Sequence, residues 1–184
     1  MKFKSVVLDT NVILRSFSNP ALLYKIIEVS KRNAMEVVVS DSILMELEEH
    51  TNVAAELAYK RLERLAKETN YSLGIKDLFV RVVSDLIDVM LTLRKLRAEA
   101  LTTKDLLKAK EECGELVEAV KGSDPKDVHV IVLSIKVRPS ILLSYDERAF
   151  GRHIKALAAE CSIEVASPRE FFSRFGEGGQ KESF

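Results

Sequence analysis

Two aspartates stand where a carboxylate can do chemistry. Asp9 directly follows an apolar run, residues 6–8, and precedes a segment with helical periodicity. Asp146 occupies the same kind of position near the other end of the chain, just beyond the predicted strand 141–144. A carboxylate that follows a buried strand lies at one edge of a sheet, where a ligand can reach it. The first question is whether other acidic residues join these two.

Two further acids lie near the start of predicted helices. Glu46 is in the first turns of the helix after the predicted strand 36–40, and Asp127 is in the first turn of a predicted helix, residues 125–137. In a doubly wound parallel sheet, every strand-to-helix junction lies at the carboxyl edge of the sheet. The helix runs away from that edge over about 20 Å, and the next strand returns to it. We therefore expect all four carboxylates to converge on one cleft.

Such a cluster of negative charges needs a counter-charge. Two like charges about 5 Å apart repel by roughly 3 kcal/mol at an effective dielectric constant near 20. A ligand set of carboxylate oxygens, without histidine or cysteine, selects hard cations such as Mg²⁺ or Mn²⁺. These ions orient phosphate groups and activate water for phosphodiester hydrolysis. The four acids therefore predict metal-assisted phosphoryl chemistry.

Capping and turn formation are alternative explanations for several polar residues here. Asp124 precedes a proline, which is typical of an N-cap residue, so it either caps the helix or contributes to the site from a second layer. Asp127 is also placed for a capping box, and Asp146 for a turn. Asn11 either orients Asp9, contacts a substrate or caps the first helix.

The elements that must position these residues alternate between strand and helix. The apolar patterns predict strands at residues 3–8, 36–40, 141–144 and 163–167, with helices between them. This alternation is typical of an α/β fold with a parallel sheet. We expect one domain over residues 1–175, followed by a flexible polar tail at 176–184.

The middle of the chain interrupts this alternation. Residues 51–122 contain no convincing strand and predict a helical insertion of two or three long helices, one of which ends at Gly122 as its C′ glycine. The stretch 77–91 is apolar on more than one face. Such a helix is either enclosed in the core or covered by a second subunit.

Composition limits the class of protein. The chain has 184 residues, of which 47% are apolar, so it can bury a core. Its 28 basic and 28 acidic residues cancel, so a nucleic-acid site must be a local patch or use bridging cations. Cys113 and Cys161 form neither a CxxC pair nor a zinc pattern, and we expect two buried thiols. With no predicted signal peptide or membrane span, we expect a soluble cytoplasmic protein.

Four motifs give the chain a resemblance to PIN-domain nucleases. They are DTNV at 9–12, SDSILMEL at 40–47, DVHVIVLSI at 127–135 and LLSYDERAF at 142–150. In the last of these, the hydroxyl residue Ser144 precedes Asp146 by two positions, and in the second Ser40 precedes the helical Glu46. The resemblance covers about residues 4–50 and 123–172.

The resemblance implies a Rossmann-like PIN fold with a central, mostly parallel sheet of about five strands. It implies Mg²⁺ or Mn²⁺ bound by the acidic cluster, with Asn11 and Ser144 in supporting roles, and endonuclease activity on single-stranded RNA. Many members are VapC-type toxins with a paired antitoxin protein, and many form homodimers. The chain departs from the family in its long segment between the second and third motifs, in Ser144 where threonine is commoner, and in the spacing of Phe150 from Asp146.

Other functions remain open on the sequence alone. A catalytically inactive PIN scaffold that binds RNA or protein has no need of four acids. A flap-type DNA nuclease requires more acids and a threading arch, for which the long helices leave room. A phospho-aspartate phosphatase requires an aspartate where Asn11 stands. The basic residues of the insertion either contact RNA phosphates or form an ordinary solvent-exposed helix face. These residues are Arg94, Lys95, Arg97, Lys104 and Lys108.

Overall fold

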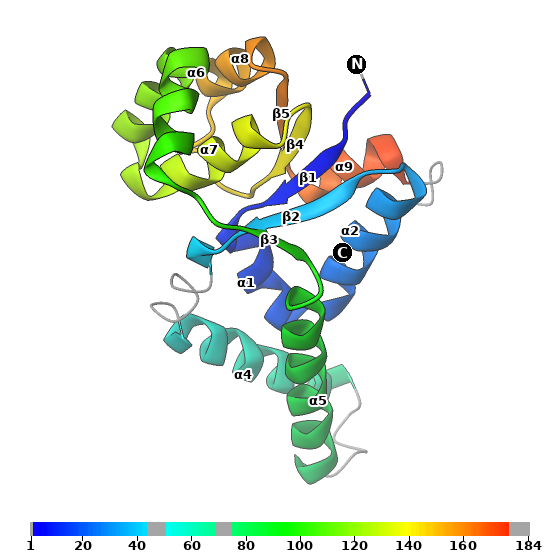
Figure 1. The fold of residues 1–184 in the computed structure, drawn as a ribbon. Helices are drawn as coiled ribbons and strands as arrows, with labels where there is room; N and C mark the ends of the chain where they lie inside the picture. The colour runs from blue at the N-terminus through cyan, green and yellow to red at the C-terminus, as the bar shows by residue number, and fades with distance from the viewer. Residues whose placement is uncertain (1, 44–50, 69–74, 177–184) are drawn as a thin grey trace.

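Five parallel strands form the centre of the molecule, in the order β3-β2-β1-β4-β5 (Figure 1). The computed structural model describes residues 2–43, 51–68 and 75–176, so Glu46 and the predicted tail lie outside the described residues, apart from Gly176. The predicted α/β fold and parallel sheet are confirmed. The strands are β1 Ser5–Leu8, β2 Glu36–Ser40, β3 Arg97–Glu99, β4 Ser140–Leu143 and β5 Ile163–Ala166.

Helices cover both faces of this sheet. The elements α1 Thr10–Ser18, α2 Pro20–Arg32 and α9 Pro168–Phe175 lie on one face. The elements α6 Thr103–Ser123, α7 Val128–Lys136 and α8 Arg152–Glu160 lie on the other. Side chains alternate between the two faces along each strand. In β1, Val6 and Leu8 therefore belong to one apolar core and Val7 to the other.

The strand order reverses between β1 and β4. From β1 the chain moves outward through β2 to β3, and it then returns to the other side of β1 to form β4 and β5. Ligands of open α/β sheets bind where the strand order reverses, outside the carboxyl ends of the strands. Leu8 and Leu143 are paired at this point. The residues that follow them are Asp9 and Ser144.

Strand β3 corrects the expectation that residues 51–122 contain no strand. Its three residues pair in parallel with β2, from Val38 opposite Arg97 to Ser40 opposite Glu99. The strand is short and charged, so it has none of the apolar alternation by which strands are recognised in a sequence. It forms because the edge of β2 offers backbone partners. The predicted insertion is therefore partly built into the sheet.

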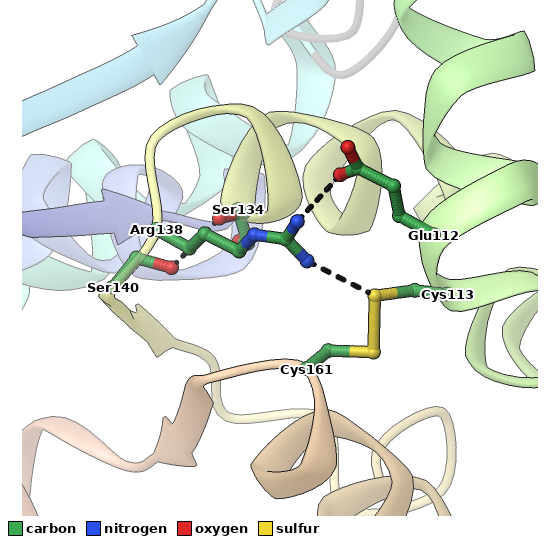
Figure 2. Close-up of a disulfide and its surroundings, with 6 residues drawn as sticks. All are labelled: Glu112, Cys113, Ser134, Arg138, Ser140 and Cys161. Atoms are coloured by element: carbon green, nitrogen blue, oxygen red, sulfur yellow. Dashed lines mark hydrogen bonds and ion pairs between the residues drawn. A yellow bond between two sulfur atoms is a disulfide. The ribbon is translucent and has the colours of Figure 1, made fainter.

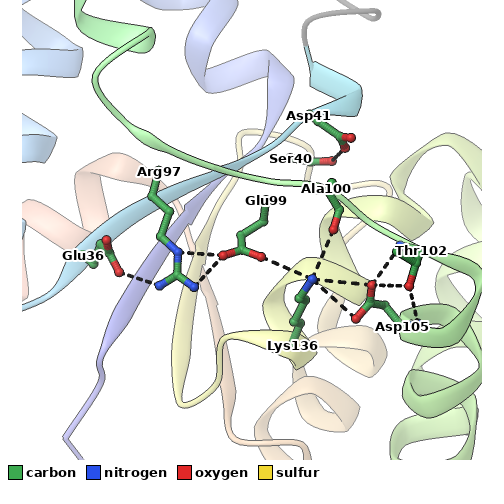
Figure 3. Close-up of polar contacts among 9 residues, drawn as sticks. All are labelled: Glu36, Ser40, Asp41, Arg97, Glu99, Ala100, Thr102, Asp105 and Lys136. Atoms are coloured by element: carbon green, nitrogen blue, oxygen red, sulfur yellow. Dashed lines mark hydrogen bonds and ion pairs between the residues drawn. The ribbon is translucent and has the colours of Figure 1, made fainter.

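An ion-pair network fixes β3 to its neighbours (Figure 3). Arg97 bridges Glu36 at the start of β2 and Glu99 of its own strand, and these two carboxylates raise the pKa of its guanidinium. Lys136, from the last turn of α7, lies 3.2 Å from Glu99 and 3.5 Å from Asp105 of α6. Single exposed ion pairs contribute little to stability, but this network joins β2, β3, α6 and α7 and limits how far these four elements can move relative to one another.

The boundaries of several helices differ from the expected ones. Helix α6 continues through Gly122 to Ser123, so this glycine lies inside the helix and not at C′. The predicted helix 125–137 begins as a 3₁₀ turn, Pro125–Asp127, and α7 starts at Val128. Helix α8 starts only at Arg152, because a turn that follows Asp146 occupies the residues after β4.

Helices α4 Thr51–Glu68 and α5 Ile75–Leu93 project away from the sheet (Figure 1). The side chains of Arg61 and Arg64 both donate to the carbonyl of Ser18 at the end of α1, and Arg61 also pairs with Asp85 of α5. Helix α5 is not enclosed in the core as the first alternative required. One side is buried, including Leu78 and other apolar residues, whereas the opposite side is exposed. None of the described helices is long and apolar enough to cross a membrane.

The two cysteines form a disulfide, which corrects the expectation of two thiols (Figure 2). Cys113 of α6 and Cys161 at the end of α8 are 48 positions apart, with their Cα atoms 6.2 Å from each other. Arg138 donates to the Cys113 sulfur at 3.3 Å and pairs with Glu112 at 2.5 Å. The packing of α6 against α8 brings the cysteines together. That packing is tertiary, so no local motif predicts it.

Candidate active site

Asp9 is a buried carboxylate beside the strand-order reversal between β1 and β4. Its backbone N–H donates to the Leu143 carbonyl at 3.0 Å, so it extends β1 alongside β4. Asp9 stands at the N-cap position of α1, yet its side chain makes no capping hydrogen bond. A capping carboxylate is worth about 1 kcal/mol to a helix. The side chain instead accepts hydrogen bonds from Asn11 and Ser144, and only 3% of the residue is exposed.

Asn11 and Ser144 hold one oxygen of this carboxylate. The Asn11 amide donates to Asp9 Oδ2 at 2.6 Å, and the Ser144 hydroxyl donates to the same atom at 2.6 Å. Two donors compensate a buried charge that would otherwise be costly. They also fix the orientation of the carboxylate. Asn11 therefore orients Asp9, as one of its predicted roles required, and does not cap α1.

Ser144 is the centre of this hydrogen-bond network. Besides its donation to Asp9, its hydroxyl oxygen accepts from the Asn11 amide at 3.1 Å and from the Asp146 backbone N–H at 2.9 Å. Asn11 also accepts from the Tyr145 backbone N–H at 3.0 Å. One hydroxyl thus joins the residues that follow β1 to those that follow β4. It couples the position of Asp9 to that of Asp146.

Asp146 has a structural role whatever its function. Its Oδ1 accepts from the backbone N–H groups of Arg148 and Ala149, both at 2.9 Å, which stabilises the turn after β4. Asp146 is therefore a turn residue, as one alternative predicted, and Oδ1 is the atom that stabilises the turn. This does not exclude a site role, because the turn holds the carboxylate at the carboxyl edge, beside Ser144.

Asp124 and Asp127 occupy different positions at the start of α7. The Asp124 carboxylate accepts from the Lys126 backbone N–H at 2.9 Å and caps the 3₁₀ turn, as the capping alternative predicted. Asp127 is half-buried at the N-terminus of α7, where its carboxylate makes no capping bond to that helix. Helix α7 packs against β1 and β2 and ends at Lys136, just before β4 begins at Ser140, so its N-terminus points toward the carboxyl edge, where Asp9 lies.

Three of the four predicted acids, Asp9, Asp127 and Asp146, lie among the described residues, and these three are not grouped as a metal site. Glu46 lies outside the described residues, and within residues 2–43, 56–68 and 77–176, where side chains are described, no group of three or more His, Cys, Asp or Glu residues is placed to hold a metal ion. The donor chemistry nevertheless fits a hard cation. Asp9 and Asp146 supply carboxylate oxygens at the ends of neighbouring strands, and such oxygens are the ligands that Mg²⁺ and Mn²⁺ prefer.

Sequence reasoning missed Arg15 and Tyr145, which lie directly beside the network. The Arg15 guanidinium stacks over the Tyr145 ring, 3.8 Å from its centroid. Partial burial raises the pKa of the Tyr145 phenol, and the nearby Arg15 opposes this rise. The spacing contained a usable signal, because Arg15 lies four residues after Asn11 and thus on the same face of α1.

The basic residues predicted to contact RNA are in part already neutralised. Arg97 pairs with Glu36 and Glu99, and Lys108 lies 3.9 Å from Glu112. For these two, the solvated-face alternative describes the structure better than a free phosphate contact.

Replacing Ser144 tests its role as the centre of the hydrogen-bond network around Asp9. We expect Ser144→Ala to lower the free energy of unfolding by about 1–3 kcal/mol, because buried partners of the hydroxyl lose their hydrogen bonds. Ser144→Thr keeps the hydroxyl, so we expect it to remain close to the parent protein. Urea denaturation of the three proteins measures the difference. Equal losses in both variants would contradict a role for the hydroxyl and would indicate only tight packing.

The fold and site together define a class of protein. It has a parallel α/β sheet with carboxylates and supporting polar side chains at its strand-order reversal, where ligands of such sheets bind. A family model described as PIN domain matches residues 5–148, and the chain belongs to this family. The family is one of nucleases, so the prediction from the four motifs is confirmed at that level. No curated protein matches the chain.

Proposed function

We propose that the protein is a metal-dependent endoribonuclease that hydrolyses phosphodiester bonds of single-stranded or structured RNA with water as the nucleophile. The observation that carries this proposal is the buried Asp9 carboxylate. It makes no helix cap and accepts hydrogen bonds from Asn11 and Ser144 beside the strand-order reversal. A scaffold without catalytic function has no use for an oriented, buried charge that costs stability.

In this proposal the four acids hold Mg²⁺ or Mn²⁺. The residues are Asp9, Glu46, Asp127 and Asp146. When bound, the metal supplies charge neutralisation for the acids and the phosphate, and it lowers the pKa of water. Asn11 and Ser144 keep the Asp9 carboxylate oriented, and the turn after β4 keeps Asp146 in place. These residues therefore reduce the reorganisation that substrate binding would otherwise require.

The test is cleavage of end-labelled single-stranded RNA by the purified protein with Mn²⁺, Mg²⁺ or EDTA. We expect cleavage with either metal and none with EDTA. Single-stranded and flap DNA are the matched substrates, and cleavage of DNA alone would favour the flap-type nuclease. Binding of RNA without cleavage under any metal would favour the inactive scaffold. The toxin role and its paired antitoxin stay predictions from the resemblance.

We also propose that α5 mediates a homodimer. Its exposed side carries large apolar residues at helical spacing, and these are Phe79, Val80, Ile87, Met90 and Leu91. Beside this stripe, the exposed Arg81 and Asp88 lie seven residues apart, and neither forms an ion pair within the described part of the chain. In a two-fold antiparallel pairing of α5, Arg81 of one copy approaches Asp88 of the other. The stripe is therefore self-complementary in charge as well as apolar.

A single charge in the middle of the stripe should separate the copies. Ile87 is 54% exposed, so Ile87→Glu leaves the fold intact while placing a charge at the proposed interface. We expect the parent to be dimeric and this variant monomeric in size-exclusion chromatography with light scattering. Leu107→Glu is the control, since Leu107 is 56% exposed on α6. A monomeric parent, or a dimer that Ile87→Glu leaves unchanged, would rule out this interface.

A further inference from the structure

Arg15 and Tyr145 form a stacked pair that extends the acidic site. The guanidinium carbon of Arg15 lies 3.8 Å from the centroid of the Tyr145 ring. The N–H groups of a guanidinium lie in its own plane and therefore point outward over the edge of the ring below it. There they can donate to a planar or tetrahedral anion. Arg15 is exposed, whereas Tyr145 is half-buried and packs against the core below α1. The ring therefore acts as a support and the guanidinium as its accessible surface.

The pair is joined to Asp9 through two short segments. Residues 9, 11 and 15 follow one another along α1, and residues 144–146 follow β4. Ser144 donates to Asp9, Asn11 accepts from the Tyr145 backbone, and Arg15 covers the Tyr145 ring. Arg15 lies one helical turn beyond Asn11, which is about 6 Å along the helix axis. The guanidinium is thus held next to the acidic site and not within it.

Arg15 carries a charge that no carboxylate of residues 2–43, 56–68 and 77–176 pairs with, in contrast to Arg97 and Arg138. The chain has no net charge with which to attract a polyanion. The acids of the site repel RNA, so a local cation beside them is needed to hold the strand. Among the described residues, Arg15 is a cation held over an aromatic ring beside these acids.

We propose that Arg15 binds the backbone phosphate next to the scissile one in a single-stranded RNA, and that Tyr145 is the positioning residue that keeps its guanidinium flat and oriented. This inference rests on the proposed function for the identity of the substrate. It goes beyond that function in assigning a substrate contact to the face of α1 that begins with Asn11. Arginine is suited to the contact because it can donate two parallel hydrogen bonds to one phosphate.

The experiment compares Arg15→Gln with Lys25→Gln. Lys25 of α2 is also a cation over an aromatic ring, with its Nζ 5.2 Å from the Phe172 centroid, but α2 and α9 contribute no residue to the site. Affinity for a fluorescent single-stranded oligoribonucleotide is measured by anisotropy in EDTA over a range of salt concentrations. The Michaelis constant and turnover number are measured with Mn²⁺. Thermal melting of each variant reports any loss of stability.

We expect Arg15→Gln to weaken RNA binding about five- to tenfold and to raise KM without lowering kcat. The slope of log affinity against log salt should fall by about 0.7, the value for one phosphate contact with a single strand. Tyr145→Phe keeps the ring and should resemble the parent, whereas Tyr145→Ala should show the same binding defect as Arg15→Gln. Lys25→Gln should leave affinity and salt slope unchanged.

The outcomes separate this inference from the proposed nuclease function. RNA binding that depends on Arg15, in a protein that cuts no RNA, would support the contact while overturning the nuclease. RNA cleavage with affinity, KM and salt slope equal in Arg15→Gln and Lys25→Gln would overturn the contact and leave the nuclease standing. An Arg15→Gln variant that melts earlier but binds RNA normally would assign the stacked pair a structural role only, and would also overturn the contact. A parent that neither binds nor cuts RNA would overturn both.

Discussion

Asp9→Asn is expected to abolish RNA cleavage while leaving the protein folded. Asparagine has nearly the same shape as aspartate and still offers a carbonyl oxygen to the donors Asn11 and Ser144, so the hydrogen bonds at this position can persist. What is lost is the negative charge that a metal requires. A metal contributes several kcal/mol of transition-state stabilisation, so we expect the rate to fall by about a thousandfold or more.

Asp124→Asn provides the matched control for this charge removal. The Asp124 carboxylate caps the 3₁₀ turn before α7, and asparagine caps a helix start as well as aspartate does. We therefore expect Asp124→Asn to cut RNA like the parent protein. Initial rates on labelled RNA, with circular dichroism to confirm folding, measure both variants. Equal cleavage by Asp9→Asn and the parent would point to a contaminating ribonuclease and would remove Asp9 from the site.

The neighbourhood of Asp9 was accessible from the sequence because parallel sheets obey strict rules. In such sheets the residues after each strand lie at one edge, so Asp9 and Asp146 can be placed near each other without knowledge of any contact. The resemblance to the family motifs adds Asn11 and Ser144 in supporting roles. The structure brings Asp9, Asn11 and Ser144 into one hydrogen-bond network. Their catalytic role stays a prediction. The sequence could not show that one Asp146 oxygen is committed to a turn, because this depends on backbone geometry after β4.

Features that depend on tertiary contacts were not accessible in this way. Strand β3 has three residues and two charges, and only its pairing with β2 and the ion pairs of Arg97 define it as a strand. The exposed side of α5 could not be told from a buried one, because its apolar residues occupy more than one face of the helix. For Arg15, the spacing from Asn11 indicates its face of α1, but its ring partner Tyr145 follows β4, and only the fold brings the two together.

Reducing the disulfide should produce the largest change in stability. The bond joins α6 to α8 across 48 positions. In the chain-entropy model, closing a loop of this length destabilises the unfolded chain by about 4 kcal/mol, and measured disulfides typically contribute about 2–4 kcal/mol. Both helices pack on the same face of the sheet as α7, so the disulfide that connects them stabilises the apolar core on that face. We therefore expect dithiothreitol to lower the free energy of unfolding of the parent by about 2–4 kcal/mol.

Serine variants determine whether this effect belongs to the bond. Cys161→Ser should be as unstable without dithiothreitol as the reduced parent, and the reductant should not destabilise it further, since no crosslink remains. Urea denaturation of both proteins, with and without reductant, measures this difference. Thiol titration of the unfolded parent provides the independent readout, with no free thiol expected before reduction and two after it. Two thiols before reduction, together with a parent insensitive to dithiothreitol, would mean that Cys113 and Cys161 pack as a reduced pair, and the cysteine prediction from the sequence would then be correct after all.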